Sequence, residues 1–216
     1  MSNRVSIIFS VLLIFFLVSC ATTSKTRTNA ERQVLLDREL QNWQTFKITG
    51  MVEGRVGIFS GRFNTVIAKT TDKMRIDVMS GGVFGIGGGV LFAGYIDGEQ
   101  FQYRLPGNQD IEVKDLDGDM RLLYQIFSEQ LLNHIERNKA RIVETLRHEF
   151  LGFQVSFTES MKIREILGVK DNIQMEFIYD RQDNLQEIKA SIPQIRNVTI
   201  HIDKVEYDNV SVRPLR

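Results

Sequence analysis

The sequence predicts a mainly β protein of the α+β class, with a strongly curved antiparallel sheet wrapped around an inserted helix. Three observations lead to this prediction. Short segments in which apolar and polar residues alternate recur along most of the chain and are separated by turn residues. Two segments carry apolar residues at helical spacing, one before the strand patterns and one among them. Because each strand has a single apolar face, the sheet must curve around the inserted helix to bury it.

The first helical pattern begins at Glu31 and ends near Trp43. Leu36 and Leu40 lie at its centre, and further apolar side chains fall at spacings that place them on the same face. We therefore expect an amphipathic helix here, with the first strand starting at Phe46 directly after it.

A first series of strands follows this helix. In the clearest case Met74, Ile76 and Val78 alternate with charged residues, which is the pattern of a half-buried strand. The pair Asp97 and Gly98 suits a tight hairpin turn between two further strands. The expected strands of this series are residues 46–59, 62–70, 74–79, 90–96 and 99–105, with a short one around Ile111 and Val113.

The spacing of apolar residues changes after the first series. Residues 119–136 have the pattern of an amphipathic helix. Residues 141–157 allow two interpretations, because Leu146 and Phe150 continue a helical spacing whereas Gly152 and the alternation after it favour a strand. Alternation with a period of two then returns in residues 173–179, 185–192 and 198–207.

The N-terminus has the pattern of a secretion signal. Arg4 precedes an apolar run from Val5 to Val18 that is shorter than the roughly 20 residues of a membrane-spanning helix. The run ends in Leu17-Val18-Ser19-Cys20, which resembles the lipobox of bacterial lipoproteins. We therefore expect residues 1–19 to be removed as a signal peptide and Cys20 to carry acyl chains such as palmitate. An uncleaved anchor is the alternative.

The residues after Cys20 determine the expected location of the protein. Residues 20–30 are polar and lack periodicity, so we interpret them as the lipidated cysteine and a flexible tether. By resemblance to the sorting rule of enterobacterial lipoproteins, Ala21 in place of an aspartate implies the outer membrane, on its periplasmic face. Cys20 is the only cysteine of the chain, so no disulfide is expected.

Charge and motif content argue against several functional classes. The chain has 27 Lys and Arg and 27 Asp and Glu residues, a balance that gives no electrostatic reason to expect nucleic acid as a partner. His134, His148 and His201 are scattered and lack metal-ligand spacing, and the sequence has no nucleophile motif such as GxSxG. We expect no enzyme activity, no metal and no cofactor.

Residues 80–89 form a glycine-rich connection between two expected strands. They hold six of the sixteen glycines together with the large apolar residues Val83, Phe84 and Ile86. An exposed loop with an apolar tip can insert into a membrane or a hydrophobic partner. The alternative, in which Phe84 folds back and closes one end of the core, stays open.

These features together resemble the LolA/LolB superfamily of periplasmic lipoprotein carriers and receptors. The resemblance rests on the lipobox at Cys20, the amphipathic helix ending at Trp43 and the strand that opens with Phe46-Lys47-Ile48-Thr49-Gly50. It continues with Met74-Arg75-Ile76-Asp77-Val78 leading into an apolar, glycine-containing loop, and with strands that resume after a helical insert. It implies that residues 31–216 form an unclosed antiparallel β-barrel with a helical lid over an apolar cavity.

The resemblance also implies a function. Members of the superfamily receive acyl chains in the cavity, and the membrane-anchored receptor LolB uses an apolar residue on a protruding loop to deliver lipoproteins into the outer membrane. Phe84 matches that tip best, although the loop here is longer, richer in glycine and without the proline expected before the apolar residue. The implied function is binding of lipid or lipoprotein acyl chains and help in inserting lipoproteins into the outer membrane.

The implied partners are membrane lipid, through acylated Cys20, and lipoproteins or a periplasmic carrier; we expect a monomer. The alternative function is that of a non-enzymatic accessory or structural lipoprotein of an envelope complex, with the same fold and a filled core. Alternating apolar positions on the strands and on the inserted helix form the expected cavity lining: Ile76, Val78, Phe101, Tyr103, Leu123, Phe127, Met175 and Phe177.

Overall fold

The computed structural model describes residues 27–56, 59–81, 89–98, 100–105, 107, 110–116, 124, 128–150, 152–168, 172–192 and 196–216. Within these residues, twelve strands form one antiparallel sheet. The first six strands are β1 (Phe46–Val56), β2 (Phe59–Lys69), β3 (Lys73–Met79), β4 (Val90–Asp97), β5 (Gln100–Arg104) and β6 (Glu112–Asp115). The last six are β7 (Arg147–Phe150), β8 (Phe153–Phe157), β9 (Ile163–Gly168), β10 (Ile173–Tyr179), β11 (Leu185–Ile192) and β12 (Arg196–Glu206).

Two meanders, one from each half of the chain, build this sheet. The strand order is β6-β5-β4-β3-β2-β1-β12-β11-β10-β9-β8-β7, so the pairing of β1 with β12 joins the meanders. The strands β6 and β7 lie at opposite ends of the order, and the sheet is therefore not closed within the described residues. The predicted α+β class, with an unclosed antiparallel sheet and helices over it, is confirmed.

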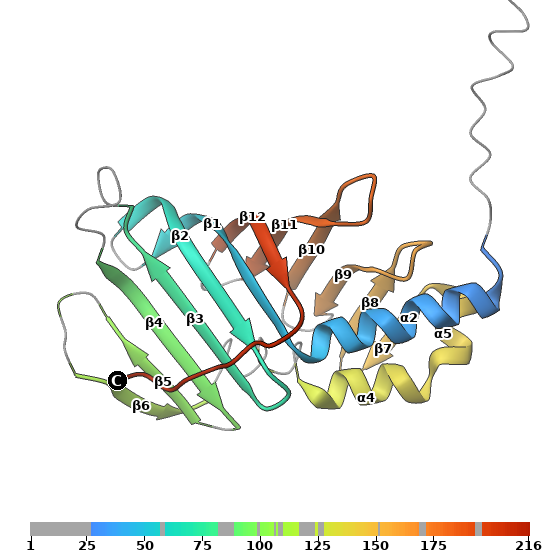
Figure 1. Ribbon diagram of the computed structural model, residues 1–216, viewed down its shortest axis with the longest axis horizontal. Coiled ribbons are helices and arrows are strands. Elements are labelled where there is room, and N and C mark those ends of the chain that lie inside the picture. Colours follow the sequence, from blue (N-terminus) through green and yellow to red (C-terminus); the bar gives the residue numbers. More distant parts are fainter. Residues whose placement is uncertain are drawn as a thin grey trace, which may run out of the picture.

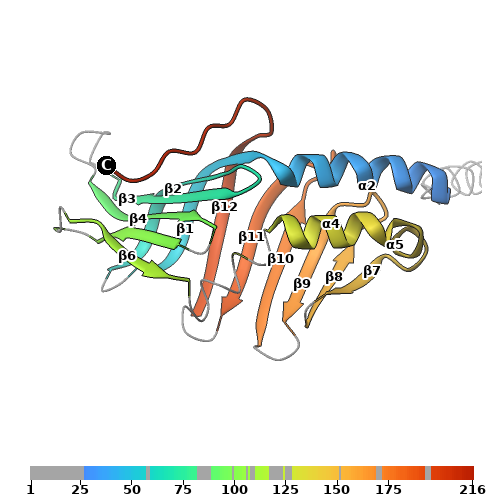
Figure 2. The same cartoon turned by 90° about the horizontal axis from the view of Figure 1, so that it is seen from below.

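The three described helices cover only one half of the sheet. They are α2 (Asn29–Gln44), α4 (Glu129–Arg137) and α5 (Lys139–Thr145). Figures 1 and 2 show them together beside the second meander, while the first meander extends away from them. We call the sheet face that meets the helices the inner face and the opposite one the outer face.

Helix α2 begins two residues earlier than its apolar pattern predicts. Thr28 and Glu31 form a capping box, in which the Thr28 hydroxyl accepts from the Glu31 amide and the Glu31 carboxylate accepts from the Thr28 amide. The helix therefore includes Asn29 and Ala30, which the polar pattern of residues 20–30 assigns to the tether. The apolar spacing did not reveal this start, because the capping residues are polar.

A buried lysine binds the other end of α2. The Lys69 ammonium of β2 donates to the carbonyl oxygens of Trp43 and Gln44, both at 3.0 Å. These carbonyls lie at the helix C-terminus, where a positive charge is favourable and where α2 has no basic residue of its own. Burial lowers the pKa of Lys69 from 10.5 to about 8, against the opposing effect of Glu129 and Asp72. Lys69 thus joins the first meander to the helix layer.

The prediction of a continuous helix over residues 119–136 is wrong at Ser128. This residue has an extended backbone, and its hydroxyl accepts from the Leu131 amide as the N-cap of α4. Apart from Tyr124, residues 117–127 lie outside the described part of the chain. The apolar spacing continues through Ser128, so the capping function of this serine was the missed signal.

Both interpretations of residues 141–157 hold for part of the segment. Helix α5 ends at Thr145, Leu146 follows in the left-handed region with φ of 55°, and β7 and β8 then form a hairpin through Gly152 at φ of 85°. Strand β9 was not predicted. A bulge leaves Arg164 unmatched between the pairs Phe157–Ile163 and Ser156–Glu165, and it breaks the alternation that would have indicated a strand.

The largest hydrophobic core lies between the helices and the inner face of the second meander, and it extends to Phe46 and Ile48 of β1. Among its members Leu36 of α2, Ile135 of α4, Ile142 of α5 and Val155 of β8 are completely buried. At about 25 cal/mol per Å², burial of this apolar surface is the main favourable contribution to packing the helices on the sheet.

A glycine permits the two meanders to pair closely. The register between β1 and β12 shifts between Thr49 and Gly50. A Cβ atom at Gly50 would lie 2.0 Å from the carbonyl oxygen of His201 and 3.2 Å from the Cα atom of Ile202. Both obstacles are backbone atoms of β12, so a side chain at position 50 would push the meanders apart.

We predict that Gly50→Ala lowers the free energy of unfolding by about 3 kcal/mol, the upper part of the range for overpacking. The matched control is Gly54→Ala on the same strand, where the added Cβ would meet its nearest neighbour, Val198 Cγ2, at an ordinary 3.5 Å. Urea unfolding of both variants measures the difference. Equal losses of stability would contradict the close approach at Gly50.

Candidate functional site

Strand register places the predicted cavity residues of β3, β5 and β10 on one face. Ile76 pairs with Gly94 and Gly94 with Tyr103, so these residues share a face of the sheet. Ile76 is also opposite Ile67, which is opposite Ile48 of β1. The pairing continues across β12 and β11 to β10, where Phe177 and Met175 face the helices. Ile76, Val78, Phe101, Tyr103, Met175 and Phe177 are all inner-face residues.

The inner face is divided into two halves that differ in burial. On β8 to β11 the inner residues are almost completely covered; Ile166 is 1% and Phe177 2% exposed. We call this part the filled half. On β2 to β5 the inner-facing Met74, Val78 and Ile96 are buried. Six other inner-facing apolar side chains are only half-buried, and we call these six the open half: Phe63, Ile67, Ile76, Phe92, Phe101 and Tyr103.

The predicted cavity residues therefore occupy different surroundings. Met175 and Phe177 lie in the filled half, packed in the core with the helices. Ile76, Phe101 and Tyr103 belong to the open half, and Val78 beside them is buried. The remaining predicted site residues lie outside the described residues: Cys20, Val83, Phe84, Ile86, Leu123 and Phe127.

Aromatic rings dominate the surface of the open half. The rings of Phe101 and Tyr103 stack with centroids 5.4 Å apart. A Cβ at Gly94 would lie 3.0 to 3.1 Å from the rings of Phe92 and Phe101. Because glycine has no side chain, both rings can pack over the backbone at this position. These rings give the open half a largely aromatic, apolar surface.

The open half has an apolar floor of buried side chains and a charged rim on the edge strand β6. Met74, Ile96 and Leu116 form a small buried cluster, against which Ile76, Phe101 and Tyr124 pack. On the edge strand β6, Glu112 accepts a hydrogen bond from the Tyr103 hydroxyl, and the Lys114 ammonium lies 5.0 Å from the Tyr103 ring centroid. An apolar floor with charged groups at one rim suits an amphipathic ligand.

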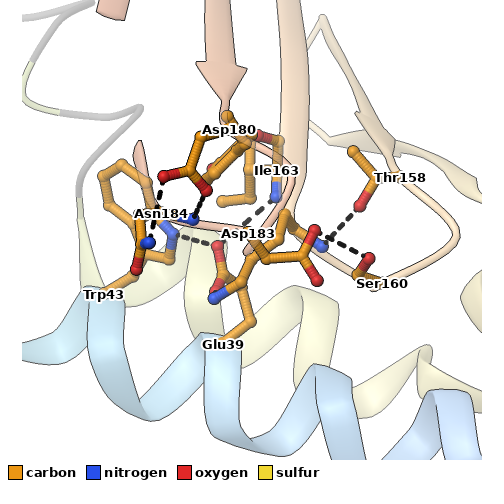
Figure 3. Close-up of polar contacts among 10 residues, drawn as sticks. Glu39, Trp43, Thr158, Ser160, Ile163, Asp180, Asp183 and Asn184 are labelled. Atoms are coloured by element: carbon orange, nitrogen blue, oxygen red, sulfur yellow. Dashed lines mark hydrogen bonds and ion pairs between the residues drawn. The ribbon is translucent and has the colours of Figure 1, made fainter. Parts of the chain in front are cut away.

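A buried carboxylate fastens α2 to the second meander (Figure 3). Glu39 is 3% exposed and accepts from the Trp43 indole at 2.8 Å, from the Lys162 ammonium at 2.7 Å and from the Ile163 amide at 3.4 Å. The last two donors belong to the connection into β9. We call Glu39, Trp43, Lys162 and Ile163 the Glu39 cluster.

Two neighbouring loops complete this fastening. Ser160 donates to Asp183 at 3.0 Å, which ties the loop before β9 to the turn between β10 and β11. Further along the helix layer, Arg32 donates to the Val143 carbonyl at 2.8 Å and pairs with Glu159 at 2.5 Å. A hollow of about 590 Å³ beside the loops has a mainly polar lining, so it does not suit an acyl chain.

Comparison with known proteins adds a likeness in fold. The sequence matches no protein-family model, and no curated protein matches it. A LolA superfamily protein from Nitrosomonas europaea matches with a TM-score of 0.34 at 8% identity, over 86% of this chain and 95% of that one.

Two other solved structures match over similar lengths. A domain described as an outer membrane lipoprotein-sorting protein, from Vibrio parahaemolyticus, has a TM-score of 0.41 at 7% identity, over 84% of this chain and 94% of that one. A DUF1329 family protein from Desulfovibrio piger has a TM-score of 0.26 at 11% identity, over 87% and 95% of the two chains. The likeness in all three cases is one of fold. Among the described residues, no helix is long and apolar enough to cross a membrane.

Two histidines that are scattered in sequence come together in the fold. The rings of His134 on α4 and His148 on β7 lie 4.8 Å apart, and Phe150 covers the His134 ring at 4.5 Å. The described residues contain no group of three or more His, Cys, Asp or Glu side chains arranged to hold a metal. Burial, together with the neighbouring His134 and Arg141, lowers the pKa of His148 below its ordinary value of 6.5.

We predict that Glu39→Ala lowers the free energy of unfolding by about 3–5 kcal/mol, because it leaves Lys162 charged, poorly solvated and unpaired. Urea unfolding measures this loss. In the double variant Glu39→Ala with Lys162→Met, the unpaired charge is gone and we expect part of the stability to return. A double variant no more stable than Glu39→Ala alone would contradict the role of the ion pair.

We predict that His148 makes the protein less stable in acid. Its pKa is lower in the folded than in the unfolded chain, so the unfolded state takes up the proton first as the pH falls through about 6.5. The buried Nε2 atom of His148 has no hydrogen-bond partner among the described residues, so a proton there has no acceptor. The free energy of unfolding should fall less steeply between pH 7.5 and pH 5 in His148→Gln than in the unchanged protein. Identical slopes would contradict this assignment.

Proposed function

We propose that this protein binds lipid, or the acyl chains of lipoproteins, on the open half of its inner face. The site would be formed by Ile76, Phe101 and Tyr103 with the other half-buried apolar residues of β2 to β5. We further propose that acylated Cys20 holds the protein at the outer membrane, on the periplasmic side, and that Val83, Phe84 and Ile86 contact the membrane during insertion of lipoproteins.

The difference in burial between the two halves carries this proposal. In the filled half, helices α2, α4 and α5 cover the apolar strand residues, and little apolar surface is left. In the open half the same sheet face presents large apolar side chains that are only half-buried. Covering such a surface with hydrocarbon is favourable by about 25 cal/mol per Å² of apolar area removed from water.

The proposed activity needs no covalent step. An acyl chain that leaves one dry surface for another, or for a bilayer, exchanges one apolar environment for a second, so its free energy changes little. Transfer then follows from a small difference in affinity between the protein and the acceptor. The charged rim at Glu112 and Lys114 lies where the polar end of such a ligand would meet water.

A second candidate function is that of an accessory lipoprotein in an envelope complex. The filled half favours it, because the core beneath the helices is packed with side chains. The Glu39 cluster and the Arg32–Glu159 pair also hold α2 firmly on the sheet, as suits a rigid scaffold. In this case the apolar surface of the open half would meet a protein partner.

We predict that residues 21–216, purified from a cell extract, retain lipid or acylated peptide in native mass spectrometry, and that they bind a triacylated peptide in solution. Phe101→Glu should weaken binding of the peptide at least about tenfold, because the loss of one buried aromatic contact corresponds to about 1.5–3 kcal/mol.

The matched control for this test is Val113→Glu on the neighbouring strand β6. Val113 is 58% exposed and points to the outer face, so its replacement should leave binding unchanged. Urea unfolding of both variants verifies that they fold. A chain that is purified without lipid and also fails to bind the triacylated peptide would exclude the acyl-binding function and leave the accessory function.

A further inference from the structure

The C-terminal segment 207–216 crosses the outer face of the first meander. Figure 1 shows it leaving β12 and running toward β4 and β5. Its anchor is Leu215, which is 6% exposed and packs with Ala93 and Tyr95 of β4. Val212 and Ile111 pack against the same cluster. This contact with the outer face is separate from the open half on the inner face.

Two arginines of the sheet hold the backbone of this segment. Arg75 on β3 is opposite Tyr95, and Arg104 on β5 is opposite Ala93, so the two guanidinium groups lie diagonally across β4. Arg75 Nη1 donates to the carbonyl oxygens of Arg213 and Pro214 at 3.1 and 3.3 Å. Arg104 Nη1 donates to the backbone oxygen of Arg216 at 3.0 Å.

The docked segment brings two more arginines to the same place. A hollow of about 300 Å³ is lined by Arg75, Arg104, Arg213, Pro214 and Arg216, and none of these side chains is acidic. The chain as a whole is neutral, with 27 basic and 27 acidic residues apart from histidine. Four guanidinium groups around one hollow are therefore a local concentration of positive charge.

Two of the four guanidinium groups, those of Arg213 and Arg216, are without a partner within the described residues. Asp77 pairs with Arg75 through two contacts of 2.8 and 3.0 Å and neutralises that one guanidinium. Arg104 Nη1 donates to the backbone oxygen of Arg216, which in the printed chain is one of the two oxygens of its α-carboxylate. Among the described residues, Arg213 and Arg216 take part in hydrogen bonds through their backbone oxygens and not through their side chains. Like charges held together repel each other, and a bound anion would remove this repulsion.

We propose that the arginine hollow binds a phosphate group. A guanidinium presents planar pairs of donors that match two oxygens of an anion, and Arg104, Arg213 and Arg216 together offer more donors than the two oxygens of a carboxylate can accept. A phosphate group has three or four oxygens directed to different sides, which suits donors arriving from the sheet and from the segment. Its source is an anionic phospholipid headgroup or free phosphate.

Phosphate binding and docking of the segment are coupled in this arrangement. Arg104 belongs to the sheet and Arg213 and Arg216 to the segment, so the complete site exists only when the segment lies on the outer face. A ligand that binds only the docked state stabilises it in proportion to its affinity. Bound phosphate should therefore slow hydrogen exchange of the backbone amides in residues 210–216.

The test uses the full chain, purified in the neutral detergent dodecyl maltoside at low salt. Calorimetric titration with inorganic phosphate measures binding from solution, and native mass spectrometry of mixed micelles with phosphatidylglycerol or phosphatidylcholine measures binding of a headgroup. The double variant Arg213→Gln with Arg216→Gln removes two exposed guanidiniums without touching the sheet. The control is Arg164→Gln with Arg181→Gln, which removes two exposed arginines elsewhere.

We expect the Arg213/Arg216 variant to bind phosphate at least about tenfold more weakly than the unchanged protein. It should also lose the effect of phosphate on hydrogen exchange. The control variant should match the unchanged protein in both measurements. Binding of inorganic phosphate alone would identify a soluble source, and retention of phosphatidylglycerol but not phosphatidylcholine would identify a lipid headgroup. Absence of both, equal retention of phosphatidylglycerol by the Arg213/Arg216 variant and the unchanged protein, or equal loss in the control would overturn the proposal. The Arg213/Arg216 variant leaves the open half intact, so lipid that it retains as well as the unchanged protein does is not bound in the hollow.

Discussion

The carboxylate of Glu39 is nearly out of contact with water and meets three donors, one from its own helix and two from the approach to β9. A buried charge is tolerated only if its hydrogen bonds are complete, so this carboxylate fixes where α2 lies and how far along the sheet it sits. The large core depends on that position, because Leu36, Leu40 and Trp43 of α2 fill it from above. Lys69 fixes the C-terminal end of the same helix, one turn beyond Glu39.

Because these contacts hold the helices at one side of the sheet, the two halves of the inner face differ in burial. One continuous sheet carries an apolar face through both meanders, yet the core that contains the described helices takes in mainly the second. From the first meander it includes only Phe46 and Ile48 of β1, with Ile67 of β2 packed against it. The proposed function depends on this inequality, and so does the alternative, since the same protein contains a packed core and a half-buried aromatic surface. The outer face adds a third region, where a charged segment rather than a helix covers the strands.

Much of the fold followed from local patterns. The Asp97-Gly98 hairpin and the alternation around Ile76 predicted their strands within one or two residues, because turn chemistry and a single buried face act over short distances. Strand β9 was not predicted, because its bulge at Arg164 interrupts the alternation of apolar and polar residues.

The site was less predictable than the strands. Periodicity assigned apolar residues to one face, but which half the helices cover depends on distant contacts such as Glu39 with Lys162. In the sequence, nothing distinguishes Glu39 from the other polar residues of an amphipathic helix. The arginine hollow could not be predicted from the sequence for a similar reason. Arg75 and Arg216 become neighbours only through strand register and the path of the C-terminal segment.

The pairing of β1 with β12 has a consequence for how the chain reaches this structure. Within each meander every strand pairs with its neighbour in sequence, whereas this one contact joins residues 46–56 to residues 196–206. During synthesis from the N-terminus, this edge of β1 therefore stays unpaired until almost the whole chain has been made. Such long-range pairing slows folding, and an unpaired strand edge is open to association with other chains. Early protection of that edge, by a chaperone or by the chain itself, would favour assembly of the correct sheet.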